Sequence, residues 1–230
     1  MVSISNIVRK LVTSKPIIYE GMIQGIVSHT SLAEYLLPEI EKELGKEVQL
    51  PAIIMAIRRY NETLFESEKI KHPDFKFNTE IIMKTGLADI TLVKSPSAIE
   101  KLKKLYSIVN FDRGDTLNII HGNYEITIVI SEKHLKKTKE FLKDEKILNI
   151  EKDLVSLSIS FSSDFLHTPG IISKAIRKLA WENINIYENI STMTELIFII
   201  NTKDSVRAYK ALEMLIEESN KDSKENDLNI

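Results

Sequence analysis

The chain has 230 residues, 43% of them hydrophobic, a length and composition typical of one large folded domain or of two or three small ones. Its 31 basic and 33 acidic residues give a formal charge of -2, so bulk charge provides no attraction to nucleic acid or anionic lipid. The absence of cysteine excludes disulfides, thiolate nucleophiles and cysteine-ligated metals.

From about residue 4 to residue 64, apolar residues recur at spacings of three and four, the pattern of amphipathic helices. Residues that start or stop helices divide this region: Pro16 at a tolerated first-turn position, Ser28, Thr30 or Ser31 as a cap, Gly45 as a stop, and Pro51 at the next start. The pattern predicts an all-α domain over residues 1–66.

The polar, proline-bearing stretch that follows predicts a linker or short wing over residues 67–86. Residues 87–150 then alternate as a strand, a helix, two strands around His121-Gly122-Asn123, and a second helix. Residues 151–218 repeat this β-α-β-β-α order. The charged end of the chain, residues 219–230, has no core pattern, and we expect it to be disordered.

Two tandem β-α-β-β-α units predict an α+β protein whose helices lie on one face of antiparallel sheets, a ferredoxin-like arrangement. The strand around Leu196, Phe198 and Ile200 is also apolar at Ile197 and Ile199, so both of its faces are expected to be buried. Its own helices cover one face. The other would be covered by the first repeat or by another subunit. The single tryptophan, Trp181, closes the helix of the second unit and is expected to pack at an interface between repeats.

The stretch LSISFSSDFLHTPGIISKAIRKLAWENINIYENIST, followed by ELIFII and a helix, resembles an ACT domain, and most of all the regulatory repeats of aspartate kinases. The resemblance covers residues 154–216 and rests on Pro169-Gly170, on Asn185 and on the strand order. Asn183 stands where that family has a helix-ending glycine. Asparagine is the other residue that readily adopts the left-handed conformation needed there.

This resemblance implies a small-ligand site, most simply for an amino acid, in the loop that leads to the helix N-terminus, where free backbone N–H groups meet a carboxylate. Simpler roles compete with this one: Pro169-Gly170 as a plain helix start, Asn185 as a turn residue, and Asp164 or His167 as solvent-exposed loop residues. The implied ligand-binding residues are Asp164, Phe165, Leu166, His167, Thr168, Pro169, Gly170, Ile171 and Asn185.

Residues 87–148 resemble the same domain in strand order only, because Ser95-Pro96-Ser97 stands where Pro-Gly is expected. Such a degenerate repeat is expected to pair rather than to bind. The tandem with its helical N-terminus looks like an archaeal group of conserved helical-plus-ACT proteins.

The stretch SLAEYLLPEIEKELGKEVQLPAIIMAIRRY suggests a helix-turn-helix that would bring Arg58, Arg59 and Tyr60 to the DNA major groove and Lys46 to its backbone. Charge argues against this, because residues 1–70 carry nine acidic residues. A helical interaction or dimerisation module is the alternative. The basic residues of this region number eight: Arg9, Lys10, Lys15, Lys42, Lys46, Arg58, Arg59 and Lys69.

The sequence carries little catalytic signal. Its five histidines have no metal-ligand spacing, and its 7 glycines form no phosphate-binding loop. The acidic stretch Asn110–Asp115 is interpreted as a turn rather than as an acid/base site. We expect no catalytic residues, no metal and no cofactor.

We therefore expect a non-enzymatic regulator that senses a small molecule and acts on DNA as a homodimer joined through its ACT repeats. The alternative is a regulatory subunit that assembles with a metabolic enzyme and does not bind DNA. No run of about 20 apolar residues predicts a membrane span, and the expected location is the cytoplasm.

Overall fold

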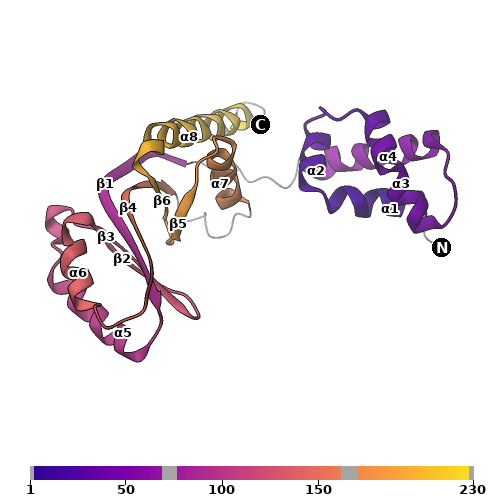
Figure 1. The fold of residues 1–230 in the computed structure, drawn as a ribbon. Helices are drawn as coiled ribbons and strands as arrows, with labels where there is room; N and C mark the ends of the chain where they lie inside the picture. The colour runs from indigo at the N-terminus through magenta and orange to yellow at the C-terminus, as the bar shows by residue number, and fades with distance from the viewer. Residues whose placement is uncertain (1–2, 69–76, 162–169, 228–230) are drawn as a thin grey trace. The chain divides into compact units, whose positions relative to one another are not determined.

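The computed structural model describes residues 3–68, 77–161 and 170–227. The chain forms two compact units, Met1–Pro73 and Asp74–Ile230, and Figure 1 shows the first as helices and the second as a sheet with helices.

The first unit packs four helices around one apolar core that includes Leu11, Leu36 and Ile57. The helix start and stop residues match the prediction. Pro16 begins the second helix, Ser28 caps the third, and Gly45 ends the third in the left-handed conformation. The helices are α1 (Ile4–Thr13), α2 (Pro16–Ile23), α3 (His29–Leu44) and α4 (Leu50–Glu68).

The second unit contains two successive β-α-β-β-α repeats, as predicted. The first repeat consists of β1 (Phe77–Val93), α5 (Pro96–Leu102), the short 3-10 helices η1 (Lys103–Ser107) and η2 (Phe111–Arg113), β2 (Leu117–His121), β3 (Glu125–Ser131), η3 (Glu132–His134) and α6 (Leu135–Phe141). The second consists of β4 (Ile147–Phe161), α7 (Ile171–Trp181), β5 (Ile186–Ser191), β6 (Glu195–Asn201), η5 (Thr202–Asp204) and α8 (Ser205–Asp227).

All six strands join one antiparallel sheet in the order β2-β3-β1-β4-β6-β5. The long strands β1 and β4 serve both repeats. In β1, residues 87–93 pair with β3, whereas residues 77–84 pair only with the end of β4. In β4, residues 154–160 pair with β6, whereas residues 147–151 pair only with β1. Each repeat therefore takes its fourth strand from the other.

Each half of the sheet has its own core beneath its own helices. Figure 1 shows α5 and α6 beside one end of the long strands, and α7 and α8 beside the other end. Ile90, Leu92 and Ile128 pack with α5 and α6, while Leu157, Phe198 and Leu212 pack in the core under α7 and α8. Burying these helices against the sheet supplies most of the apolar contact that either repeat needs.

On the face of the sheet that the described helices do not cover, apolar side chains of the two repeats pack against one another. Leu87 and Val129 of the first repeat form a buried cluster with Leu154 and Ile199 of the second, and Ile197 packs against it. The prediction that a partner covers the second face of β6 is thus confirmed, and the partner is the first repeat.

Three parts of the chain differ from expectation. Residues 77–86, predicted as linker or wing, begin β1, because their pairing partners lie about 75 positions later in β4 and no local pattern reveals them. Part of the tail predicted as disordered continues α8 to Asp227. Trp181 is 87% exposed, so it does not pack between the repeats.

Candidate ligand-binding site

The predicted ligand site lies where the chain enters α7. Gly170 caps this helix in the left-handed conformation, with φ of 90°, and no described side chain accepts the N–H groups of the first turn. Ser173 does not fill the gap, because its hydroxyl donates to the Gly170 carbonyl at 2.6 Å. The start of α7 therefore presents backbone donors with a partial positive charge.

The other predicted ligand residues divide into three groups. Ile171 packs in the core under α7 at 4% exposure, so only its backbone is left for a ligand. Asn185 is exposed and lies just before β5. Asp164, Phe165, Leu166, His167, Thr168 and Pro169 lie outside the described residues.

Asn183 has φ of 54°, one of two described non-glycine residues with a positive φ. This confirms the prediction that asparagine replaces glycine in the left-handed turn after α7. The turn brings the chain directly from Trp181 into the segment that carries Asn185 and β5.

The equivalent helix of the first repeat begins very differently. The Glu145 carboxylate, which follows α6, accepts hydrogen bonds from the hydroxyls of Ser95 and Ser97 at 3.0 and 3.1 Å. Ser95 also caps α5 by accepting from the Ala98 N–H at 3.0 Å. Lys101 then pairs with the other Glu145 oxygen at 2.8 Å. The hydrogen bond from Lys101 is the main cause that lowers the pKa of Glu145.

In the first repeat, then, an internal carboxylate stands beside the start of the helix, and in the second no described side chain does. The sequence favoured pairing over ligand binding for the first repeat, but it did not reveal the carboxylate of Glu145 beside its helix. Glu145 lies 50 residues from Ser95, so only the structure brings them together.

Asp115, at the end of the predicted acidic turn, has a structural role. It accepts from the Asn110 N–H at 2.9 Å and from His134 Nε2 at 2.7 Å, and it pairs with Lys133. These hydrogen bonds, above all that from Lys133, hold the pKa of Asp115 far below its usual range. A carboxyl held ionised in this way is unsuited to donate a proton, in agreement with the predicted turn.

Among the residues predicted to touch DNA, Lys46, Arg58 and Arg59 are exposed on the first unit, and Tyr60 is half-buried. Arg58 lies 3.4 Å from Glu62, one turn further along α4. The Tyr60 hydroxyl lies 3.1 Å from that of Thr13 on α1, and the Arg9 guanidinium lies 5.6 Å from the Tyr60 ring centre. The structure thus brings Arg9 beside Tyr60, a contact that the sequence pattern alone does not predict.

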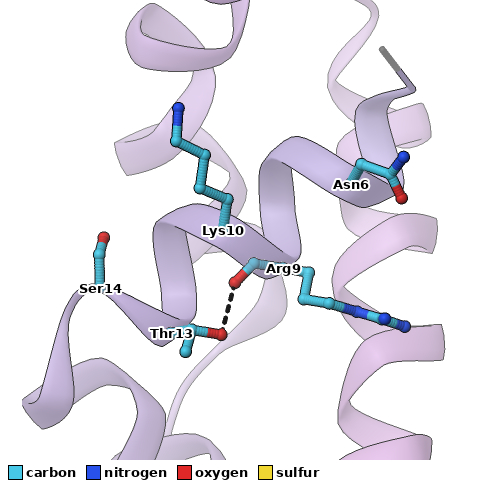
Figure 2. Close-up of a pocket in the computed structure, with 5 residues that line it drawn as sticks. All are labelled: Asn6, Arg9, Lys10, Thr13 and Ser14. Carbon is cyan, nitrogen blue, oxygen red and sulfur yellow. Dashed lines mark hydrogen bonds between the residues drawn. The ribbon is translucent and has the colours of Figure 1, made fainter. Parts of the chain in front are cut away.

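A shallow hollow of about 490 Å³ lies on α1, lined by Asn6, Arg9, Lys10, Thr13 and Ser14. Figure 2 shows Asn6 and Arg9 extending to one side of the helix and Lys10 to another. Thr13 donates to the Arg9 carbonyl at 2.7 Å, and Lys10 pairs with Glu43 at 2.8 Å. Arg9 is therefore the basic group of the hollow that lies over an aromatic ring and pairs with no carboxylate of the described residues.

Within residues 3–68, 77–161 and 170–227, no group of three histidine, aspartate or glutamate side chains gathers to hold a metal ion. No helix in the same part of the chain combines the length and the apolar character needed to cross a membrane.

Comparison with known proteins places the fold. No protein-family model and no curated protein matches the sequence. Among solved structures, the regulatory subunit of aspartate kinase from Thermus flavus matches with a TM-score of 0.50 and 17% identity, over 63% of this chain and 99% of that chain. Aspartate kinase from Clostridium acetobutylicum matches with a TM-score of 0.51 and 20% identity, over 63% of this chain and 36% of that enzyme. This chain therefore contains an ACT-type fold like that in the regulatory parts of aspartate kinases.

Proposed function

We propose that this protein is a ligand-sensing regulator whose second repeat binds a small molecule with a carboxylate, an amino acid being the expected class. The observation that carries the proposal is the difference between the two helix starts. The start of α5 has Glu145 beside it, whereas the start of α7 is capped by Gly170 and no described side chain.

Glu145 serves as an internal stand-in for a ligand. One oxygen takes hydrogen bonds from Ser95 and Ser97 at the start of α5, and the other takes an ion pair from Lys101 in the last turn of the same helix. A free carboxylate at α7 would meet the same favourable helix dipole. Asn185 has a side-chain amide that both donates and accepts, so it suits either the carboxylate or the ammonium of an amino acid.

The fold likeness supports a regulatory role over a catalytic one. One structural neighbour is itself a regulatory subunit, and the other is described as an allosteric enzyme. The likeness is one of fold, and a fold hosts many functions, so the proposal depends on the helix starts rather than on the likeness.

The shared strands suggest how binding would be transmitted. The second repeat begins with the second half of β4, and the first half of β4 completes the first repeat. A ligand that favours one arrangement of α7 against β4 would shift the packing of both repeats, by no more than its difference in affinity for the two arrangements.

For the output we propose that the helical unit binds DNA in a homodimer joined through the repeats. In support, α3 and α4 are joined by a short turn, Arg58 and Arg59 are exposed on α4, and Arg9 adds a cation beside Tyr60. Glu43 and Glu39 neutralise Lys10 and Lys15 on the same unit. This neutralisation favours the alternative, a subunit that assembles with a metabolic enzyme.

The test is a thermal-unfolding screen of the full chain against the standard amino acids, because a ligand that binds the native state raises the unfolding midpoint Tm. We expect one amino acid to raise Tm with dose, and Asn185→Ala and Gly170→Val to abolish that rise. Asn123→Ala, at an exposed turn of the first repeat, is the matched control and should keep it. A flat response across the panel would refute the sensor and leave the repeats as assembly modules.

A further inference from the structure

A chain of polar side chains links the two repeats on the sheet face that has no helices. Thr91 on β1 donates from its hydroxyl to Asp89 Oδ1 at 3.3 Å, and the same hydroxyl lies 3.3 Å from that of Thr127 on β3. A hydrogen bond from Thr127 acts to lower the pKa of Glu188 on β5. Each threonine hydroxyl has one proton, so Thr91 donates to Asp89 and Thr127 to Glu188, and these two carboxylates from different repeats lie at the ends of one polar row.

Asp89 is the buried end of this chain. It is 3% exposed, and its second oxygen, Oδ2, is fully buried and has no hydrogen-bond partner in the part of the chain that the structure describes. An ionised carboxylate oxygen left unpartnered in the interior is costly, so native proteins normally satisfy it. Glu188, Thr91 and Thr127 are half-buried, so the cluster opens to solvent on their side.

The cluster is strongly negative. Glu151 on β4 lies directly opposite Asp89 in the sheet, and within the described residues none of Asp89, Glu151 and Glu188 forms an ion pair with a basic side chain. Burial first, and then repulsion from Glu188 and Glu151, raises the pKa of Asp89 to about 6. Burial also raises the pKa of Glu188. Among the described residues, therefore, no basic side chain balances the charge of this site.

We propose that this cluster is a second ligand site, in which Asp89 and Glu188 bind the primary ammonium group of a small amine. An ammonium has three N–H donors and no acceptor. Three acceptors are available to the ammonium: Asp89 Oδ2, the Glu188 carboxylate and a threonine hydroxyl oxygen. The two carboxylates also supply the negative charge that balances the ammonium. A charge-assisted bond would also satisfy Asp89 Oδ2, which has no hydrogen-bond partner among the described residues.

The donor set suits an ammonium better than a metal ion. Calcium takes about six to eight oxygen ligands and magnesium about six in strict octahedral geometry. The cluster offers two carboxylates and two hydroxyls, and the part of the chain that the structure describes holds no three-residue metal-binding group.

The site is independent of the one proposed at α7. It lies on the opposite face of the sheet from α7. Asp89 alternates with Ala88 and Ile90, which pack under α5 and α6, so it shares the other face with Leu87. Leu154 pairs with Leu87 on that face, whereas its neighbour Val155 packs in the core under α7 and α8. A probe amine without a carboxylate therefore reports on this site alone.

The experiment measures Tm of the full chain with n-butylammonium chloride, tetramethylammonium chloride and potassium chloride at equal ionic strength. We expect a dose-dependent rise with butylammonium only, because tetramethylammonium has no N–H donor. Asp89→Asn and Glu188→Gln should each abolish the rise. The exposed Asp112→Asn is the matched control and should keep it.

If the variant of the buried residue, Asp89→Asn, does not fold, Glu188→Gln still tests the site, because Glu188 is only half-buried. Gly170→Val should leave the butylammonium response intact even if it abolishes an amino-acid response, so the two proposals fail separately. Equal rises with all three salts, or a rise that survives both Asp89→Asn and Glu188→Gln, would overturn the site. So would the absence of any rise at a pH where Asp89 is ionised.

Discussion

Gly86 and Asp153 occupy equivalent positions in the two repeats, and both adopt the left-handed backbone conformation, with φ of 67° and 55°. Each comes just before the leucine, Leu87 or Leu154, at which its long strand passes from one repeat to the other, and these two leucines pair in the sheet. The pairing register shifts on both sides of Leu87. An extra residue at each crossing keeps the apolar side chains of both halves on the helix side of the sheet.

Gly86→Ala is expected to lower the free energy of unfolding by about 1–2 kcal/mol, the cost of a left-handed alanine. An added Cβ at Gly86 would meet nothing within 4 Å, so the loss would come from the backbone alone. Urea denaturation measures it. A loss below a few tenths of a kcal/mol would mean that the strand relaxes out of this conformation.

Asp153→Gly should have the opposite sign, with a gain of up to about 1 kcal/mol, because glycine adopts this conformation without strain. The hydrogen bond from Thr202 to the Asp153 carbonyl involves only the backbone of Asp153 and is kept. If Asp153→Gly destabilises the protein in the same denaturation series, the aspartate side chain must make a favourable contact at the crossing.

The crossing marks the limit of what the sequence could predict. Strand alternation and helix periodicity identified both repeats. Local chemistry identified Gly45 and Asn183 correctly and included Ser28 among three candidate caps. These features depend on a few neighbouring residues. The start of β1 depends on hydrogen bonds to Ser156–Phe161, far along the chain, and its sequence, FNTEIIMK, has no regular alternation that would reveal them.

The sites were predicted unevenly for the same reason. The backbone donors at Gly170 follow from a local motif. Glu145 beside Ser95, Arg9 beside Tyr60 and Glu188 beside Thr127 all join residues from separate elements, so each required the fold.

Glu145→Gln is expected to lower the urea midpoint of the second unit at neutral pH, because it removes the charge that Lys101 and the start of α5 share. The lowered pKa of Glu145 means that its stabilisation is complete above its ordinary pKa and is lost as the pH falls below it. The difference between variant and wild type should therefore vanish in acid. Glu140→Gln, an exposed glutamate on α6, is the control. If Glu145→Gln remains less stable than the wild type in acid, the loss of stability comes from the changed side-chain shape and not from the lost charge.

Asp89→Asn should stabilise the protein in amine-free buffer at about pH 8, by up to about 3 kcal/mol for a pKa raised by about two. The raised pKa of about 6 means that the folded protein binds this proton more tightly than the unfolded chain does. Wild-type stability should therefore increase as the pH falls through about 6, and the advantage of the variant should disappear near pH 4. Urea denaturation across this range measures it, and an advantage that does not change with pH would mean that Asp89 is already neutral.

Arg58→Ala combined with Arg59→Ala is expected to weaken binding to duplex DNA about tenfold or more and to reduce the salt dependence by about one unit of slope for each phosphate that is no longer neutralised. Arg9→Ala should act in the same direction, because the Tyr60 ring holds this cation beside α4 and no described carboxylate neutralises it. Lys42→Ala is the matched control, since Lys42 lies on α3 between Glu41 and Glu43 and should contribute little. Fluorescence anisotropy over a range of salt concentrations measures all four proteins. If wild-type affinity for DNA does not fall with salt, no phosphates are neutralised, and the helical unit must instead dock on another protein.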